Sequence, residues 1–249
     1  MRVKDYIIKK TRRNKMHFSL LDPDKQKPER AGEIARVVTK AGSSAIMVGG
    51  STVLSQSDVD CTVKAIKKNT DLPVILFPSG ARFLSRYADA VFFMSLLNSR
   101  NPDYIIREQV KGALFVKESG LEPLSMGYVI VEPGMTAGRV GEADLIKRDD
   151  VDTAVRYALA AQYLGMDFLY LEAGSGASHP VPDDMIKNVK RNTDMILIVG
   201  GGIKNPDVAR EKAKAGADII VTGTSLEKEH DDLERHVSDI IKAIEEVKN

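Results

Sequence analysis

Glycine-rich turns end two strongly apolar segments in the last third of the chain. Residues 194–202 read DMILIVGGG and residues 217–224 read ADIIVTGT. Runs of apolar, mostly β-branched residues are typical of parallel strands that are buried on both faces. Glycine at a strand end lets a backbone N–H approach a ligand closely, because no Cβ intervenes. Neighbouring N–H groups of this kind bind phosphate well.

A third turn of the same type, AGSG at residues 173–176, precedes these two. Three glycine-bearing strand ends in consecutive units predict a phosphate site better than one glycine motif does. The alternative is that the glycines only form tight turns. The candidate phosphate-binding residues are Gly174, Ser175, Gly176, Gly201, Gly202, Gly223 and Thr224.

A tyrosine and a carboxylate lie just before the first of these turns. In the segment Phe168–Glu172, which reads FLYLE, alternation places Tyr170 and Glu172 on one face of a strand and Leu171 on the other. A carboxylate that points into a barrel mouth beside a phosphate site suits a general base. The alternative is a structural ion pair between Glu172 and a lysine or arginine of a neighbouring strand.

Oxygen-bearing side chains follow the first two apolar segments of the chain. Asp22 follows residues 15–21, and Ser51 and Thr52 follow residues 44–48. A carboxylate with hydroxyl oxygens suits Mg²⁺, a hard ion that keeps several waters and usually binds together with substrate phosphates. The alternative is that these residues only cap the helices that follow them.

The third and fourth apolar segments, residues 74–77 and 90–97, are unusually hydrophobic. Most of their side chains are expected in the core. Some of them, with Met47 and Tyr104, could line a groove for a long apolar substrate, and ordinary core packing is the alternative for each residue.

The histidines and the single cysteine give no catalytic or metal-binding pattern. No His-x-His or His-Glu-x-x-His spacing occurs, which argues against a zinc site. His17 lies in the first apolar segment, where it could point into a barrel. His230 and His236 lie in the last predicted helix, where exposure to solvent is expected. Cys61 falls within a predicted helix, which is the wrong place for a nucleophile.

These residues are positioned by eight alternating strand and helix segments. Such alternation with short connections predicts a parallel sheet covered by helices. Eight units and 249 residues predict a single (β/α)8 TIM-barrel domain over residues 1–249. The glycine-rich and acidic residues follow strands, so they would gather at the C-terminal face of the barrel, with phosphate-binding loops after strands 6–8.

Three further features of the barrel are expected. Residues 2–14 form a short amphipathic helix that could plug the bottom of the barrel. A short helix connects the third and fourth strands. A longer loop, residues 135–147, follows the fifth strand.

Composition limits the functional classes. Charged residues make up 29% of the chain and nearly cancel, giving a net charge of +1, which argues against nucleic acid as a partner. One cysteine cannot form an internal disulfide and fits a reducing, cytoplasmic location. No apolar run approaches the roughly 20 residues of a spanning helix, so no transmembrane segment is expected.

Seven motifs occur in a fixed order between residues 17 and 224: HFSLLDPDK, MVGGST, ILFPSG, YVIVEPGMTAGRVG, YLEAGSGA, IVGGGI and VTGT. Together they resemble the geranylgeranylglyceryl phosphate synthase family of archaeal TIM-barrel prenyltransferases. The resemblance implies transfer of a C20 prenyl group from geranylgeranyl diphosphate to the C3 hydroxyl of sn-glycerol 1-phosphate, with release of pyrophosphate. This step forms the first ether bond of archaeal membrane lipids.

The resemblance also implies site residues. Mg²⁺ would be bound by Asp22 and Ser51, and Glu172 and Tyr170 are the predicted catalytic residues, with Glu172 as the base. Family members are dimers or larger, so a homo-oligomer is expected. Glycerol phosphate would be bound by Tyr170, Leu171, Glu172, Ala173, Gly174, Ser175, Gly176, Gly201, Gly202, Gly223 and Thr224.

Alternative functions remain open at this point. Bacterial relatives use a longer, heptaprenyl chain, so the family does not fix the chain length. A phosphosugar isomerase or aldolase-type barrel would share the phosphate site, but it needs a lysine Schiff base or an Asp/Cys pair at strand ends. Lys15 opens a strand rather than ending one, which disfavours that alternative. A non-catalytic binder of a phosphate ligand is the third possibility.

Overall fold

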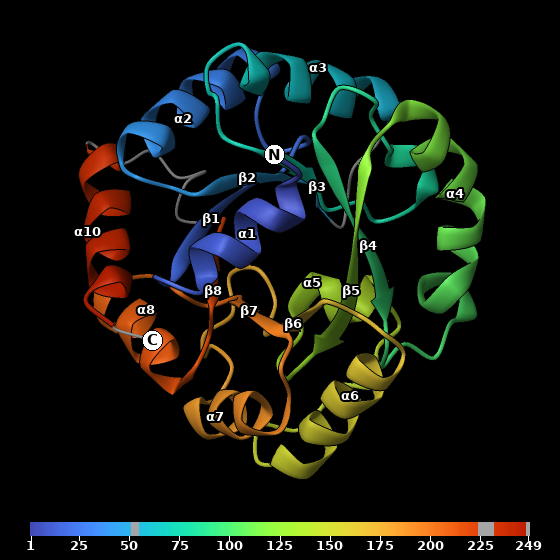
Figure 1. The fold of residues 1–249 in the computed structure, drawn as a ribbon, viewed down its shortest axis with the longest axis vertical. Helices are drawn as coiled ribbons and strands as arrows, with labels where there is room; N and C mark the ends of the chain where they lie inside the picture. The colour runs from blue at the N-terminus through green and yellow to red at the C-terminus, as the bar shows by residue number, and fades with distance from the viewer. Residues whose placement is uncertain (51–54, 224–231, 248–249) are drawn as a thin grey trace.

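Eight parallel strands close into a barrel in the computed structural model (Figure 1), which describes residues 1–50, 55–223 and 232–247. Each strand pairs with its neighbours in sequence, and the first pairs with the eighth, where Met16 lies opposite Ile219. The predicted (β/α)8 barrel is therefore confirmed. The strands are β1 (Met16–Leu21), β2 (Ala45–Val48), β3 (Val74–Leu76), β4 (Ala90–Leu96), β5 (Glu122–Ile130), β6 (Phe168–Glu172), β7 (Ile196–Gly200) and β8 (Ile219–Thr222).

Helices form a ring around the strands (Figure 1). Two connections between strands differ from the sequence-based expectation. The connection between β3 and β4 contains only the three-residue 3₁₀ turn η1, and the expected loop 135–147 begins with the short helix α5. The helical segments are α1 (Val3–Thr11), α2 (Pro28–Lys40), α3 (Gln56–Lys67), η1 (Ala81–Phe83), the π-helix η2 (Asp103–Arg107), α4 (Glu108–Ser119), α5 (Met135–Val140), α6 (Val151–Tyr163), α7 (Asp183–Asn192), α8 (Pro206–Ala215) and α10 (Leu233–Glu245).

The N-terminal helix α1 covers the bottom of the barrel, as the sequence predicted, and it crosses the centre of the ring in Figure 1. Val3 and Ile7 are buried in the cluster that fills the barrel interior. The backbone N–H of Val3 donates to Glu122 Oε2 at 2.6 Å, at the start of β5. This contact satisfies an N–H group of the first helical turn, which has no partner within the helix.

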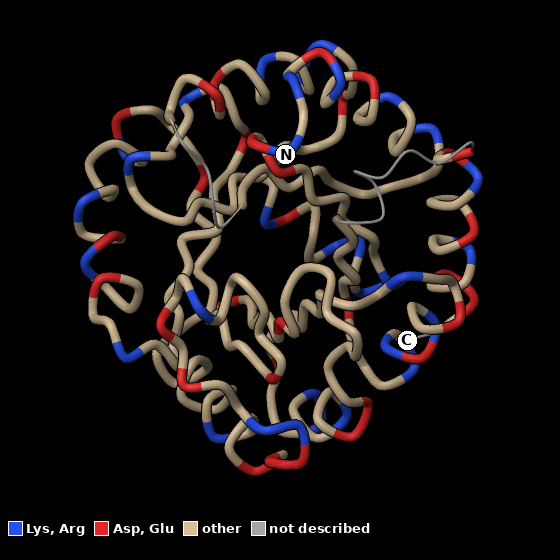
Figure 2. The backbone as a smooth tube through the Cα atoms, turned by 180° about the vertical axis from the view of Figure 1, so that it is seen from behind, with Lys and Arg blue, Asp and Glu red and all other residues tan. Residues whose placement is uncertain are grey.

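Alternate residues of each strand face the interior and the outer helices. Phe168, Tyr170 and Ile198 belong to the interior cluster, whereas Leu169 and Leu171 pack with the helices outside. Charged residues lie mainly on the outer ring, and the strands are mostly uncharged (Figure 2). The period of two therefore holds along β6 and fixes which residues reach the barrel mouth.

His17 faces the outer layer, so the expectation that it points into the barrel is wrong. Its neighbours Met16 and Phe18 fill the interior, and alternation turns the imidazole outward. Nε2 lies 2.8 Å from Thr222 Oγ1, and Nδ1 lies 3.2 Å from Ser43 Oγ. Burial, with a smaller contribution from His236, lowers the pKa of His17 to about 3, which keeps the ring neutral.

Candidate active site

Glu172 ends β6 and points into the mouth of the barrel. The residue is only 6% exposed. Oε1 accepts the backbone N–H of Gly174 at 2.6 Å, and the Tyr170 hydroxyl also donates to this carboxylate. A Cβ at Gly201 would overlap Oε1, so a glycine is needed where β7 ends. Within the part of the chain that the structure describes, no lysine or arginine pairs with Glu172, which removes the ion-pair alternative there.

Aromatic rings hold Tyr170 in place beneath this carboxylate. The Tyr170 ring lies 5.3 Å from the ring of Tyr128 and 5.6 Å from that of Phe77, measured between centroids. Its hydroxyl lies against Gly200, where a Cβ would overlap it. Packed aromatic rings of this kind fix side-chain geometry, so the hydroxyl is aimed at Glu172.

Burial dominates the protonation of this pair. Desolvation raises the pKa of Glu172, although the hydrogen bonds from Tyr170 and Gly174 oppose part of the rise. Desolvation also raises the pKa of Tyr170 well above its usual value, with a further contribution from the Glu172 charge. A raised pKa makes a carboxylate a stronger base, which suits proton abstraction.

A first cavity lies over the ends of β6, β7 and β8. Its wall includes glycine turns that the sequence predicted and Ser175, which lies in the turn after β6. We call it the phosphate cavity. It is lined by Leu20, Tyr170, Glu172, Ser175, Gly176, Gly201, Gly202, Ile203, Lys204, Val221, Thr222, Gly223 and His236.

Not every predicted phosphate residue reaches this cavity. Leu171 and Ala173 are fully buried and pack toward the outer helices, because they alternate with Tyr170 and Glu172. The prediction that they contact the ligand is not supported by this placement. Gly174 uses its N–H to hold Glu172 rather than lining the cavity. Thr224 lies outside the described residues.

Two nitrogen-bearing side chains of the phosphate cavity were missed by sequence reasoning. Lys204 and His236 both line it. The prediction that His236 is solvated is wrong, because the side chain is half-buried against the cavity and close enough to influence His17. Lys204 had a local signal, since it stands two residues after Gly202. His236 had no local signal, because α10 reaches the cavity only when the pairing of β1 with β8 closes the barrel.

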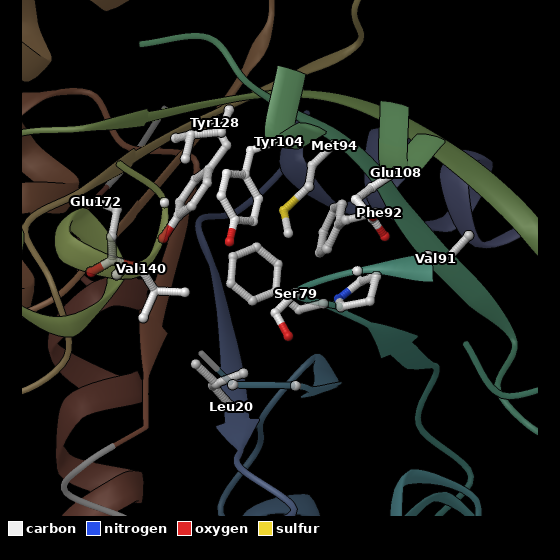
Figure 3. A pocket seen from close by; sticks show the side chains of 18 of the residues that line it. Leu20, Ser79, Val91, Phe92, Met94, Tyr104, Glu108, Tyr128, Val140 and Glu172 are labelled. Atoms are coloured by element: carbon white, nitrogen blue, oxygen red, sulfur yellow. The ribbon is translucent and has the colours of Figure 1, made fainter. Parts of the chain in front are cut away.

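A second cavity, the prenyl groove, runs outward from the barrel mouth over β3 and β4. Figure 3 shows Glu172 at one end and Val91 and Glu108 at the other. Tyr104, which η2 carries, and Met94 lie between these ends (Figure 3). Of the two groove residues named from sequence, Tyr104 lines it and Met47 does not, since Met47 is fully buried in the barrel interior.

The prenyl groove exists because the helix ring is incomplete. A full helix between β3 and β4 would cover the outer end of the groove, but η1 is only three residues long there. Val91 and Leu84, which belong to the outer core, are therefore accessible from the groove. Its apolar lining comprises Leu20, Phe77, Pro78, Ala81, Leu84, Val91, Phe92, Phe93, Met94, Leu96, Tyr104, Tyr128, Ala137 and Val140.

The two cavities meet at Glu172. Leu20, Glu172, Ser175 and Gly223 line both of them. A polar ligand held over β6–β8 and an apolar ligand held over β3–β4 would therefore approach each other at this carboxylate. Such an arrangement brings two reactants together at a base.

Asp22 lies beside the mouth of the prenyl groove, which it lines together with Lys25, Gly49 and Gly50. The residue is 7% exposed, and its carboxylate lies over Gly50, where a Cβ would overlap it. Lys25 Nζ is 3.5 Å from Asp22 Oδ2. Ser51, the other predicted metal ligand, lies outside the described residues.

The residues present fit Mg²⁺ bound mainly by a substrate. No group of three or more His, Cys, Asp or Glu side chains that could hold a metal ion occurs among residues 1–50, 55–223 and 232–247. A site made only by protein ligands is therefore not found there. The Asp22 carboxylate, which lies over Gly50 and beside Lys25, suits an ion that shares its coordination with a diphosphate.

The fold and these two cavities define a phosphate-binding (β/α)8 barrel with a hydrophobic groove that meets the phosphate site at a carboxylate. Similarity to known proteins narrows this class. The sequence pattern of the PcrB family matches residues 8–247. The chain therefore belongs to the PcrB family.

Relatives and solved structures agree with this assignment. The geranylgeranylglyceryl phosphate synthase of Thermococcus kodakarensis is 56% identical over 91% of this chain and 90% of its own. That of Methanothermobacter thermautotrophicus is 50% identical over 98% and 99%. A crystal structure of (S)-3-O-geranylgeranylglyceryl phosphate synthase from Thermoplasma acidophilum with its substrate sn-glycerol-1-phosphate has a TM-score of 0.96 and 45% identity, covering 99% of this chain and all of that one.

Proposed function

We propose that the chain transfers the geranylgeranyl group of geranylgeranyl diphosphate to the C3 hydroxyl of sn-glycerol 1-phosphate and releases pyrophosphate. The observation that carries this proposal is the meeting of the phosphate cavity and the prenyl groove at Glu172. Relatives at 50–56% identity carry the corresponding enzyme name. A related structure was solved with sn-glycerol-1-phosphate.

The phosphate of the acceptor would be held by the turns after β6–β8. Gly176, Gly201 and Gly202 present backbone at the cavity wall, where N–H groups bind an anion closely. Lys204 and His236 add side chains at the same wall. This anchoring leaves the far end of the glycerol, with its C3 hydroxyl, directed to the barrel mouth.

Glu172 would accept the hydroxyl proton as the ether bond forms. The Tyr170 hydroxyl and the Gly174 N–H both donate to its carboxylate and hold it in one orientation. The carboxylate oxygen and the prenyl C1 then approach the glycerol oxygen from opposite cavities. Holding both reactants at this point supplies much of the rate enhancement.

The diphosphate of the donor would lie near Asp22 and Lys25, with Asp22 and Ser51 as the protein ligands of Mg²⁺. When bound, Mg²⁺ supplies positive charge that neutralises the departing pyrophosphate. Lys25 adds a second positive charge at the groove mouth. The apolar side chains that line the groove, from Phe92 near the barrel interior to Val91 at the outer end, would bind the isoprenoid tail. Burial of apolar surface is favourable by roughly 25 cal/mol per Å².

A homo-oligomer in the cytoplasm is part of this proposal. Ile106, Val110 and Leu114 form an exposed apolar stripe at helical spacing along η2 and α4, with exposures of 56%, 67% and 69%. Exposed stripes of this size favour contact with another copy of the chain. A single exposed Cys61 fits a reducing compartment. No helix in the described part of the chain is long and apolar enough to cross a membrane.

Turnover of radiolabelled sn-glycerol 1-phosphate, with Mg²⁺ and separate C15, C20 and C35 prenyl diphosphates, tests the proposal. Label that becomes lipid-extractable most rapidly with C20 supports the geranylgeranyl reaction. A maximum at C35 keeps the reaction but assigns a longer donor. No extractable label with any donor, in folded protein that binds glycerol phosphate, contradicts the proposal. A parallel Mg²⁺ titration of diphosphate binding after chelation tests the metal separately.

A further inference from the structure

His17 is a buried histidine that the proposed reaction does not use. The residue is 2% exposed and lines neither cavity. Burial lowers the pKa of its imidazole to about 3, so the ring stays neutral. A neutral imidazole donates from one nitrogen and accepts at the other, and the hydrogen bonds around it decide which. The contacts of the two ring nitrogens therefore show what this side chain can do.

Nε2 of His17 connects the ring with the phosphate cavity through Thr222. It lies 2.8 Å from Thr222 Oγ1, and Thr222 ends β8 and lines that cavity. The neighbouring Val221 belongs to the barrel interior, so alternation along β8 directs the Thr222 side chain to the outer layer, where His17 lies. His236 of α10 lines the cavity as well, so the cavity extends to this side of β8.

The Thr222 hydroxyl carries one proton, so the state of His17 Nε2 decides where that proton points. If Nε2 accepts, the hydroxyl proton is used by His17 and Thr222 offers a ligand no donor. If Nε2 donates, the hydroxyl proton is available to the cavity. A phosphate dianion presents only acceptors, and hydrogen bonds to charged groups are stronger than neutral ones. The second arrangement therefore favours a phosphate ligand.

Two serines on the other side of the ring favour a proton on Nε2. Ser43 Oγ lies 3.2 Å from His17 Nδ1, and Ser19 Oγ lies 3.0 Å from Ser43 Oγ. The Ser43 hydroxyl is also 3.3 Å from the carbonyl oxygens of His17 and Ala45, but the His17 carbonyl already accepts the Ser44 N–H at 2.8 Å. Donation from Ser19 to Ser43 and on to Nδ1 forms a continuous chain, in which each hydrogen bond strengthens the next. This chain leaves Nδ1 as the acceptor and Nε2 as the donor.

We propose that His17 is a positioning residue for the acceptor substrate: its Nε2–H donates to Thr222 and leaves the Thr222 hydroxyl free to donate to the phosphate of sn-glycerol 1-phosphate. This role rests on the proposed prenyl transfer and refines its acceptor site. His17 touches neither reactant and acts through Thr222. The phosphate thereby gains a side-chain donor at the end of β8, beside the backbone of Gly201 and Gly202.

The protonated nitrogen of His17 can be observed directly in the wild-type protein. NMR of protein with ¹⁵N-labelled histidine rings distinguishes the two tautomers by the nitrogen shifts and the couplings to the ring hydrogens. In protein saturated with sn-glycerol 1-phosphate we expect a proton on Nε2 and none on Nδ1. An Nδ1–H ring in that complex overturns the proposal.

Two variants separate the donor role of His17 from a structural role. His17→Gln places an amide at the position of Nε2, where it can donate to Thr222, whereas the shorter His17→Asn reaches only the position of Nδ1 beside Ser43. We expect the KM for sn-glycerol 1-phosphate to stay within about twofold in His17→Gln and to rise at least about fivefold in His17→Asn, as part of the contribution of one hydrogen bond to a charged group. The kcat and the KM for the C20 donor should stay unchanged in both.

The same measurements on Thr222 test whether His17 acts through it. Thr222→Val removes the donor, so the acceptor KM should rise at least about tenfold, as for the loss of a hydrogen bond to a charged group. Adding His17→Asn to Thr222→Val should raise it by less than a further factor of about two, because both changes remove the same contact. The control is Thr193→Val, which removes a buried hydroxyl that donates to the Val189 carbonyl at 3.0 Å, at the opposite end of β7 from the cavity. Its acceptor KM should stay unchanged.

Each outcome separates this role from the proposed function. An unchanged acceptor KM in Thr222→Val, equal KM values in the two His17 variants, or independent effects in the combined variant overturn the role of His17 and leave the prenyl transfer in place. A lower kcat with the wild-type acceptor KM in His17→Asn does the same. If His17→Asn does not fold, the wild-type tautomer and the acceptor KM of Thr222→Val decide the role. Absence of turnover with every donor in the wild type overturns the prenyl transfer, and calorimetric binding of sn-glycerol 1-phosphate to the same variants then decides the role of His17.

Discussion

Replacement of Glu172 by glutamine isolates the proton-accepting role of this carboxylate. Glutamine has the same shape, and its carbonyl oxygen can accept the Gly174 N–H that Oε1 accepts at 2.6 Å in the wild type. The neighbouring phosphate cavity is otherwise unaltered. The substitution therefore removes the base and keeps the size of the side chain and the Gly174 contact.

The magnitude follows from the loss of general-base catalysis. A positioned base contributes typically 10²- to 10⁴-fold, which corresponds to about 3–6 kcal/mol at about 1.4 kcal/mol per tenfold. Glutamine cannot accept a proton at any accessible pH. We expect kcat with the C20 donor to fall at least about 100-fold and the KM for sn-glycerol 1-phosphate to change less than about threefold.

The stability of the variant should move in the opposite direction from its activity. Burial raises the pKa of Glu172 in the folded protein, so the folded state binds this proton more tightly than the unfolded state. Stability is therefore lost as pH rises from the unfolded pKa through the folded pKa. A neutral glutamine avoids this loss, so the Tm of Glu172→Gln at neutral pH should equal or exceed that of the wild type.

The assay is a steady-state kinetic comparison with a thermal unfolding scan of the same preparations. Wild-type kcat in a correctly folded Glu172→Gln variant would refute the base assignment. A large rise in KM with unchanged kcat would show that the residue binds the acceptor instead. A Tm well below wild type would refute the argument from burial.

Further predictions follow from the same geometry. Tyr170→Phe removes a hydrogen bond that lowers the pKa of Glu172 against the larger effect of burial, so the acidic limb of the kcat/KM profile should move to higher pH; an unmoved limb would contradict that contact. Gly50→Ala places a methyl group on the Asp22 carboxylate and should raise the Mg²⁺ concentration needed for half-maximal rate, as Asp22→Asn should; identical titrations would exclude Asp22 from the metal site. Lys204→Ala should raise the KM for glycerol phosphate about 2- to 30-fold with little change in kcat, as expected for a charge-assisted contact of about 0.5–2 kcal/mol; an unchanged KM would show that Lys204 does not bind the phosphate.

Local sequence patterns predicted a large part of this molecule. The alternation in FLYLE placed Tyr170 and Glu172 at the barrel mouth, and the structure confirms this orientation. Gly201 and Gly202, predicted to form a turn at the end of a strand, line the cavity over β6–β8. Strand period and glycine conformation are properties of a few neighbouring residues, so they are readable without the fold.

Errors arose where orientation depended on partners far along the chain. The outward face of His17 is set by its pairing with β8 and its contacts with Ser43 and Thr222. His236 reaches the phosphate cavity because α10 packs beside the closure of β1 on β8. No local pattern records either contact, since the residues involved are separated by up to about two hundred positions in sequence.

The sequence by itself determined the eight-unit barrel, the family, the acid at the end of β6 and the glycine-rich turns after β6 and β7. Only the tertiary structure decided that a groove leaves this site, where it ends and which residues close it. The physical reason is that the groove is a space between η1, β4 and α4. Such a space depends on how three separate elements pack.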